Sequence, residues 1–215
     1  TYWLDLTAPP APTFVGPGPA SPASSNAPLI TGAAETGSQV RLYSNAACTA
    51  LIGGPASAAT FAAPGIAAAV ADNSTTDIYA TSTDLAGNVS PCSAKLFTYV
   101  EDSTPPGASQ ILTGPPTFGT GRDVAFTFTD VPLIAGEVRE CFLSTGADQF
   151  GPCDSPTTFA RTGLPDGTYT FKVRNVDVIG NPATTQRVFT IDNIAPSVTI
   201  VSGPEASSTD TTPTF

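Results

Sequence analysis

The feature that most constrains the fold is an internal repeat. An alternating, strand-like segment that ends at an aspartate and runs into proline occurs three times, and the marker aspartates are Asp5, Asp102 and Asp192. The intervals between them are 97 and 90 residues. Self-similarity at a regular interval is typical of repeat architectures. The sequence therefore predicts one module over residues 7–102 and a second over residues 103–192.

A second marker supports the same division. The turn-like segment Asp84–Asn88 reads D-L-A-G-N, and the segment Asp177–Asn181 reads D-V-I-G-N. Each is followed by an alternating segment that ends at the next marker aspartate, 18 residues later in the first module and 15 in the second. Two markers in the same order make chance similarity a poor explanation.

The two ends of the chain fall outside these modules. Residues 1–6 resemble the last strand of a preceding module, and residues 193–215 resemble the start of a following one. Two interpretations remain open. The chain is part of a longer array of modules, or a terminal strand is exchanged with a neighbouring copy.

Composition favours strands over helices inside each module. The chain has 19 glycines and 22 prolines, which interrupt helices, and short runs of Val, Thr, Phe and Tyr lie between them. About seven short strands in a module of this length predict an all-β fold of tandem immunoglobulin-like sandwiches. The predicted strands include Gln39–Tyr43, Ala59–Ala62, Thr75–Thr83, Val124–Phe128 and Thr168–Val176.

The second module carries a further sign of this fold. Leu164 and a Pro-Asp-Gly turn precede Tyr169 at the start of an alternating strand, which is how a tyrosine corner appears in a sequence. We expect Tyr169, Phe171 and Val173 to face the core. The first module has Thr76 at the position equivalent to Tyr169, so its corner is expected to be missing or altered.

Charge and residue content exclude several functions. There are 18 acidic residues, 8 basic residues and no histidine, with a net charge of −10. A nucleic-acid binder needs a basic stripe, and an anionic membrane surface would repel this chain. Without histidine there is no Ser-His-Asp triad and no ordinary proton relay near neutral pH, so catalysis is not expected. No apolar run approaches the length of about 18 residues that a spanning helix needs, and no leader segment is apparent.

The four cysteines allow three pairings. If each module holds its own pair, the bonds are Cys48–Cys92 and Cys141–Cys153. Zinc binding is disfavoured because no C-x-x-C spacing and no histidine are present, and free buried thiols are the plain alternative. Disulfides would place the protein in an oxidising compartment.

The D-x-x-G-N turns allow a structural and a functional interpretation. In the first, the aspartate caps its own turn, glycine takes a positive φ and asparagine tolerates the left-handed region. In the second, the turns and the Asp-to-Pro linkers lie at the same end of the sandwich and hold calcium through carboxylate and carbonyl oxygens. The candidate calcium ligands are Asp84, Asp102, Asp177 and Asp192, with Glu101 as an accessory ligand.

These motifs together resemble a known group. The D-x-x-G-N turn, the strand that ends in D-x-x-x-P and the L-P-D-G-x-Y segment resemble tandem bacterial Ig-like (Big-type) modules, which build the stalks of secreted adhesins and other cell-surface proteins. The resemblance spans essentially the whole chain. It implies an extracellular array, and in some relatives calcium bound by linker and turn aspartates stiffens the rod.

The expected function is therefore structural: a non-catalytic repeat of an extracellular fibre or adhesin stalk, secreted or on the cell surface. The expected partners are neighbouring Ig-like modules of the same or an identical chain, with a surface glycan or protein as a further candidate, and neither nucleic acid nor membrane insertion. The alternative is a glycan- or protein-binding accessory module of a secreted enzyme. No cofactor other than calcium is indicated.

Overall fold

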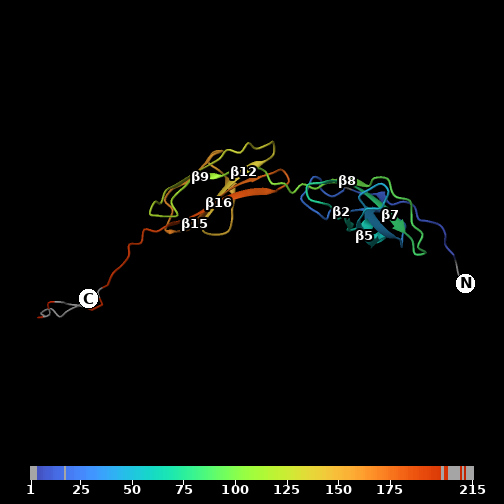
Figure 1. The fold of residues 1–215 in the computed structure, drawn as a ribbon, viewed down its shortest axis with the longest axis horizontal. Helices are drawn as coiled ribbons and strands as arrows, with labels where there is room; N and C mark the ends of the chain where they lie inside the picture. The colour runs from blue at the N-terminus through green and yellow to red at the C-terminus, as the bar shows by residue number, and fades with distance from the viewer. Residues whose placement is uncertain (1–3, 17, 200, 203–208, 210, 212–215) are drawn as a thin grey trace. The chain divides into compact units, whose positions relative to one another are not determined.

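The computed structural model describes residues 4–16, 18–199, 201–202, 209 and 211. The chain divides into two compact units. Unit 1 comprises residues 1–108, 132–138 and 175–183, and unit 2 comprises residues 109–131, 139–174 and 184–215. The strands form two β-sandwiches, built from β1–β8 and β9–β16 (Figure 1). Within the described residues, no helix has the length and apolarity to cross a membrane.

The first sandwich is organised around a four-stranded antiparallel sheet. Its order is β5–β4–β7–β8, and two pairs, β1–β3 and β2–β6, complete the module. Near the end of β8, Ala23 forms a parallel bridge with Glu101. The elements are β1 (Thr13–Phe14), β2 (Leu29–Ile30), β3 (Gly32–Ala33), β4 (Gln39–Tyr43), β5 (Leu51–Ser57), α1 (Ala58–Ala62), β6 (Ile66–Ala67), β7 (Thr75–Thr83) and β8 (Phe97–Val100).

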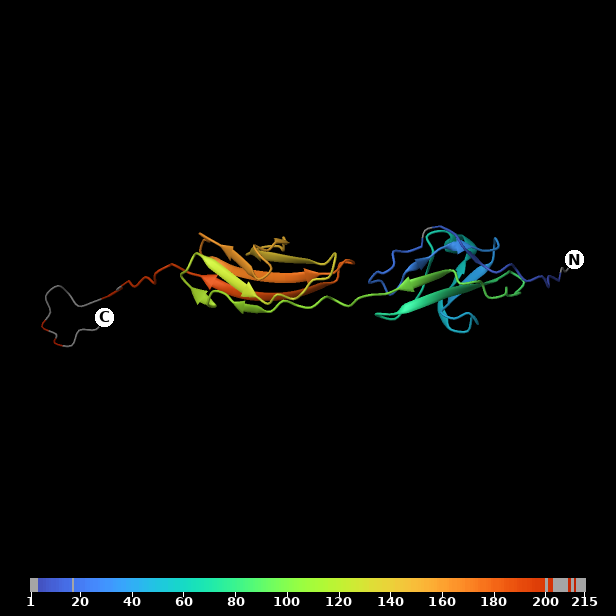
Figure 2. The same ribbon diagram turned by 90° about the horizontal axis from the view of Figure 1, so that it is seen from above.

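The second sandwich has a five-stranded sheet in the order β10–β16–β15–β12–β13 and a three-stranded sheet in the order β14–β11–β9. Figure 2 shows its strands, coloured from green to red along the chain. The short strand β10 runs parallel to β16, with Gly119 opposite Ile191. The strands are β9 (Ile111–Thr113), β10 (Phe118–Gly119), β11 (Val124–Phe128), β12 (Val138–Ser144), β13 (Gly151–Pro152), β14 (Thr158–Arg161), β15 (Gly167–Val176) and β16 (Pro182–Ile191).

Each sandwich has its own core. The first is mainly aliphatic, built around Ile30, Val40, Leu42 and Ile78. The second is aromatic, and the Phe126 ring stacks on Phe171 with a centroid distance of 3.9 Å. Alternating side chains on the strands supply these residues, because every second position faces the opposing sheet. The all-β sandwich fold expected from the sequence is confirmed.

The predicted tyrosine corner is present in the second sandwich. The Tyr169 hydroxyl donates a hydrogen bond of 2.9 Å to the carbonyl of Pro165, and Tyr169, Phe171 and Val173 are buried as expected. In the first sandwich a different tyrosine makes a comparable tether, since the Tyr99 hydroxyl donates to the carbonyl of Ser25 at 2.8 Å.

One predicted strand is wrong. Residues 59–62 form the helix α1, not a strand. The Ser57 side chain accepts a hydrogen bond of 3.1 Å from the backbone N–H of Thr60, which caps the helix, and Ala-rich sequence favours helix once a cap is available. At the ends of the chain, residues 4–6 and the described residues after 191 carry no strand. Residues 1–3 and most of 203–215 lie outside the described residues, so both terminal assignments stay predictions.

Candidate functional site

The first D-x-x-G-N turn is closed by its own aspartate. Asp84 Oδ1 accepts hydrogen bonds of 2.9 Å from the backbone N–H groups of Ala86 and Asn88. Gly87 has a φ of 92°, a conformation that favours glycine. Hydrogen bonds from the Asn88 side chain and backbone hold the pKa of the Asp84 carboxyl below its usual value. The capping role of the aspartate is therefore as expected.

The second turn repeats this geometry. Asp177 Oδ1 accepts from the backbone N–H groups of Ile179 at 2.9 Å and Asn181 at 2.8 Å, and Gly180 has a φ of 99°. Burial raises the pKa of the Asp177 carboxyl, but hydrogen bonds from Asn181, Ile179 and Gly180 outweigh it and lower the pKa overall. Both turns thus hold the asparagine side chain through the same set of hydrogen bonds.

Each turn asparagine binds the linker that precedes its module. In the first sandwich, Asn88 Nδ2 donates to the carbonyls of Asp5 at 3.2 Å and Thr7 at 3.4 Å. In the second sandwich, Asn181 Nδ2 donates to the carbonyl of Asp102 at 3.0 Å. This contact lies within unit 1, which contains both residues. The amide of each asparagine is also held by the turn aspartate, at 2.9 Å in the first turn and 2.8 Å in the second.

A second polar side chain binds each linker, at the carbonyl five residues after the linker aspartate. Ser82 Oγ donates to the carbonyl of Pro10 at 3.0 Å, and Asn175 Nδ2 donates to the carbonyl of Gly107 at 2.5 Å. Ser82 and Asn175 are fully buried, and each lies two residues before its turn aspartate. We call the pairs Ser82 with Asn88, and Asn175 with Asn181, the linker clamps.

The linker that leaves each module is also held by hydrogen bonds, to a residue in the loop before β7 or β15. Asn73 Oδ1 accepts from the Ser103 backbone N–H at 3.1 Å and from Thr104 Oγ1 at 2.6 Å. Asp166 occupies the corresponding place before β15 and accepts from the backbone N–H of Asn193 at 3.1 Å and from its side chain at 2.9 Å. We call Asn73 and Asp166 the loop anchors.

The linker aspartates shape the linkers themselves. Asp5, Asp102 and Asp192 each accept, through Oδ1, a hydrogen bond from the backbone N–H two residues later, at 2.9, 3.0 and 2.9 Å. Each turn lies beside the linker that precedes its module, as the Asn88–Asp5 bond shows. The linker that follows the first module is held instead by Asn73, before β7.

The calcium assignment to Asp84, Asp102, Asp177 and Asp192 stays a prediction. Among the residues that the structure describes, no group of three or more His, Cys, Asp or Glu side chains could hold a metal ion. The carboxylates take part in the turn and linker hydrogen bonds described above. Thermal melting in EDTA against added calcium tests the assignment, and a midpoint that rises with calcium would support it.

Glu101, the proposed accessory ligand, is buried at the end of the first sandwich. Its Oε2 accepts a hydrogen bond from the Asn73 backbone N–H and a longer one, 3.4 Å, from Ser103 Oγ. Its Oε1 is buried and has no hydrogen-bond partner among the described residues. The side chain therefore connects the last strand, the loop anchor and the linker.

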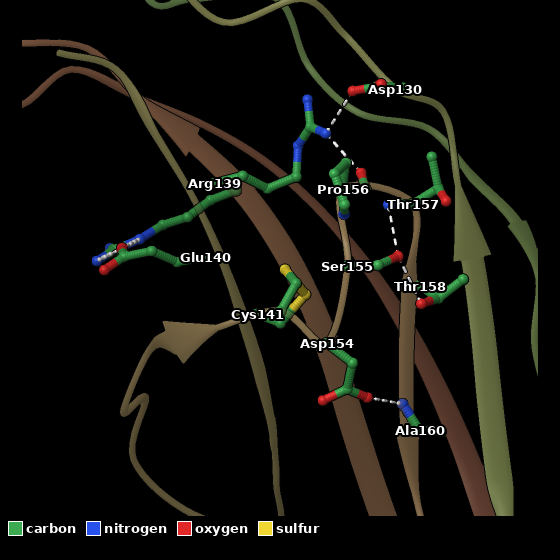
Figure 3. The surroundings of a disulfide bond; sticks show 12 residues. Asp130, Arg139, Glu140, Cys141, Asp154, Ser155, Pro156, Thr157, Thr158 and Ala160 are labelled. Carbon is green, nitrogen blue, oxygen red and sulfur yellow. Dashed lines mark hydrogen bonds and ion pairs between the residues drawn. A yellow bond between two sulfur atoms is a disulfide. The ribbon is translucent and has the colours of Figure 1, made fainter.

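The structure contains the two disulfides Cys48–Cys92 and Cys141–Cys153. The first ties the loop after β4 to the segment between β7 and β8. The second joins β12 to the residue after β13. Figure 3 shows Arg139 above this second bond, where its guanidinium donates to Asp130 at 2.8 Å and to the carbonyl of Pro156 at 2.5 Å. The disulfide and this arginine together fasten the edge of the second sandwich.

Phe150, in the loop between β12 and β13, packs within the second sandwich. The Arg174 guanidinium lies 3.7 Å from the Phe150 ring centroid and forms an ion pair of 2.7 Å with Glu140. Beside it is a polar groove of about 390 Å³. The residues lining the groove include Ser144, Asp148, Thr168, Thr170, Lys172 and Gln186.

Comparison with known proteins gives fold-level likeness only. No family model matches the chain, and no curated protein matches it. Among solved structures, the fibronectin(III)-like modules of Clostridium thermocellum CbhA are 14% identical with a TM-score of 0.40, over 84% of this chain and 92% of that one. The FN1–FN3 domains of chicken CNTN1 are 11% identical with a TM-score of 0.30, over 92% and 70%.

A third structure, a tetra-tandem repeat from the extending region of a large adhesion protein, is 16% identical with a TM-score of 0.26. It covers 87% of this chain and 50% of that one. At these values none of the three carries an argument about function.

Proposed function

We propose that the chain is a non-catalytic spacer of an extracellular fibre or stalk, in which disulfide-stapled sandwich modules are joined by linkers held on both sides. The observation that carries the proposal is the repetition of the linker clamp. At both linkers, the donor four residues after the turn aspartate binds the carbonyl of the linker aspartate. The donor two residues before the turn aspartate binds the carbonyl five residues further along the linker. A repeated joint of this kind is what a load-bearing spacer needs.

The chemistry of the linker suits this role. Proline restricts the backbone and offers a carbonyl acceptor without a competing N–H donor. Linker residues fixed by several hydrogen bonds lose the freedom that a flexible connection would have. Disulfides within each module resist extension of the chain, and they support a location in an oxidising compartment outside the cytoplasm.

Replacement of Asn181 by alanine tests the proposal. The change removes the donor to Asp102, so we expect faster backbone motion in the linker and more independent tumbling of the two modules, measured by 15N relaxation of the amides of residues 102–104 and 107. Asn88→Ala is the matched control, because it deletes the same contact at residues 5–7 and should leave residues 102–107 unchanged. Independent tumbling already present in the unmodified chain would contradict the proposal.

The second candidate, a glycan-binding accessory module, is favoured by the polar groove of the second sandwich. The Lys172 ammonium and Asp148 carboxylate that line it form an ion pair of 2.6 Å, so the groove combines paired charges with hydroxyl groups, a lining suited to a neutral, hydroxyl-rich ligand. Titration with neutral oligosaccharides should then shift the amide signals of Thr170 and Lys172. Signals that stay fixed throughout would exclude this candidate.

A further inference from the structure

The segment that follows the second sandwich repeats the acceptor side of the two clamped linkers. Asp192 Oδ1 accepts from the Ile194 backbone N–H at 2.9 Å, as Asp102 Oδ1 does from Thr104 at 3.0 Å. Proline stands four residues after each of these aspartates, at Pro106 and at Pro196. The third linker thus has the same local hydrogen bond and the same proline spacing as the linker at Asp102.

This segment is also fixed to its own module. Asp166 accepts two hydrogen bonds from Asn193, and Arg122 donates a hydrogen bond of 2.7 Å to the same carboxylate. Hydrogen bonding by the Asn193 side chain and backbone holds the pKa of the Asp166 carboxyl below its usual value. The loop anchor therefore orients the segment at its start, as Asn73 does for the linker at Ser103.

The third linker differs from the two clamped linkers in the hydrogen bonding of its acceptor carbonyls. In the two clamped linkers, the carbonyls of Asp5 and Asp102, and those of Pro10 and Gly107 five residues later, accept hydrogen bonds from a clamp. The corresponding carbonyls of the third linker belong to Asp192 and Ser197, and both residues are exposed. Within the described part of the chain, no donor reaches either carbonyl.

We propose that residues 192–197 form a docking segment for a further β-sandwich whose turn reads [Ser/Asn]-x-Asp-x-x-Gly-Asn. The partner's turn asparagine would donate to the carbonyl of Asp192, and its polar residue two positions before the aspartate would donate to the carbonyl of Ser197. This inference rests on the proposed spacer function. It adds the chemistry of the partner: two side-chain donors, six residues apart in the partner, bind two main-chain carbonyls that lie five residues apart in the docking segment.

The pattern is selective for a defined reason. Both copies in this chain satisfy it, Ser82 to Asn88 and Asn175 to Asn181, and the turn aspartate fixes the amide of the asparagine in each. A module that lacks either donor leaves an acceptor without a partner at the joint, which costs stability if that acceptor is covered. A module with a turn of different length misplaces the two donors relative to each other.

A fusion tests the inference directly. Residues 1–196 are followed by a second copy of residues 107–192, so that the acceptor spacing matches that of the linker at Asp102. In isotopically labelled protein, we expect a scalar coupling across the hydrogen bond between the side-chain nitrogen of the appended copy's turn asparagine and the carbonyl carbon of Asp192. Its size should equal that of the coupling between Asn181 and Asp102, which serves as reference in the same molecule.

Two variants and three outcomes make the test decisive. Alanine at the turn asparagine of the appended copy alone should abolish only the Asp192 coupling, whereas Asn181→Ala should abolish only the Asp102 coupling. Equal couplings at both aspartates support the inference. A coupling at Asp102 without one at Asp192 overturns the docking segment and leaves the spacer proposal standing. Loss of both in the unsubstituted fusion overturns the linker clamp, and the spacer proposal and the inference with it.

Discussion

Glu101 of the first sandwich and Ile191 of the second occupy the same place, the end of the last strand opposite a parallel partner, Ala23 in one and Gly119 in the other. Both side chains are buried. The second sandwich fills this position with an apolar residue, while the first fills it with a carboxylate whose Oε1 has no hydrogen-bond partner in the described part of the chain. The two modules therefore close the same end in chemically different ways.

Substitution of Glu101 by glutamine should raise the stability of the first sandwich. The change keeps an acceptor for the Asn73 N–H and removes a buried charge that has no cationic partner within the described residues, so we expect a gain of about 1 kcal/mol in the free energy of unfolding. Urea denaturation followed by circular dichroism measures it. Glu140→Gln, which breaks the pair with Arg174, is the control and should not stabilise.

Removal of the two tyrosine tethers should destabilise each sandwich separately. Tyr169→Phe deletes the hydrogen bond to Pro165, and Tyr99→Phe deletes the one to Ser25, each at a cost of about 1 kcal/mol. Tyr79→Phe is the matched control, since no hydrogen bond of the Tyr79 hydroxyl is found in the described structure. Equal effects of all three changes on denaturant midpoints would rule out a special role for the tethers.

The two disulfides should contribute unequally. Cys48–Cys92 joins residues 44 apart and Cys141–Cys153 joins residues 12 apart. Loop-closure entropy then predicts losses of about 4 and about 3 kcal/mol when each pair is replaced by serine. Hydrogen exchange resolves the modules, through the β7 amides for the first pair and the β15 amides for the second. A larger loss from the shorter loop would show that native-state packing outweighs chain entropy here.

Stability should fall at acid pH and not at neutral pH. The pKa values of Asp84, Asp166 and Asp177 are lowered in the folded state, against about 3.9 for an unfolded aspartate. Their ionised forms therefore stabilise the fold above pH of about 4, and this contribution is lost as the pH falls through the lower folded values.

Thermal melting across this range measures the loss. The variant Asp177→Asn cannot ionise at the second turn, so its melting midpoint should fall less steeply with acid than that of the unmodified chain. If the melting midpoints of the two proteins fall equally with acid, the Asp177 carboxylate does not contribute to the pH dependence of stability.

The repeat and the fold could be predicted because their signals are local. Strands at 39–43, 75–83 and 124–128 agree with the structure, since alternation and β-branched residues mark them. The strand Leu51–Ser57 has no such signal in the sequence, because it contains two glycines and a proline. It forms nevertheless because β5 lies at the edge of its sheet, where proline is tolerated.

The linker clamps could only partly be predicted. The capping role of the turn aspartates follows from short-range turn chemistry, and it was anticipated. The asparagine contacts were not, because the acceptor is a main-chain carbonyl 79 residues away in the case of Asn181, and no side chain at the acceptor marks it. One signal was present in the sequence: Ser82 and Asn175 are polar residues at matching positions of two strands that otherwise alternate towards the core.

Because the linker clamps recognise main-chain carbonyls, the clamp contacts themselves make no demand on the side chains of the linker. Substitutions at other linker positions therefore leave the clamp contacts intact as long as the turn keeps its two donors. Under the proposed docking, a module that shares this turn could be duplicated, deleted or moved within a gene and would meet the same two main-chain acceptors at each new position.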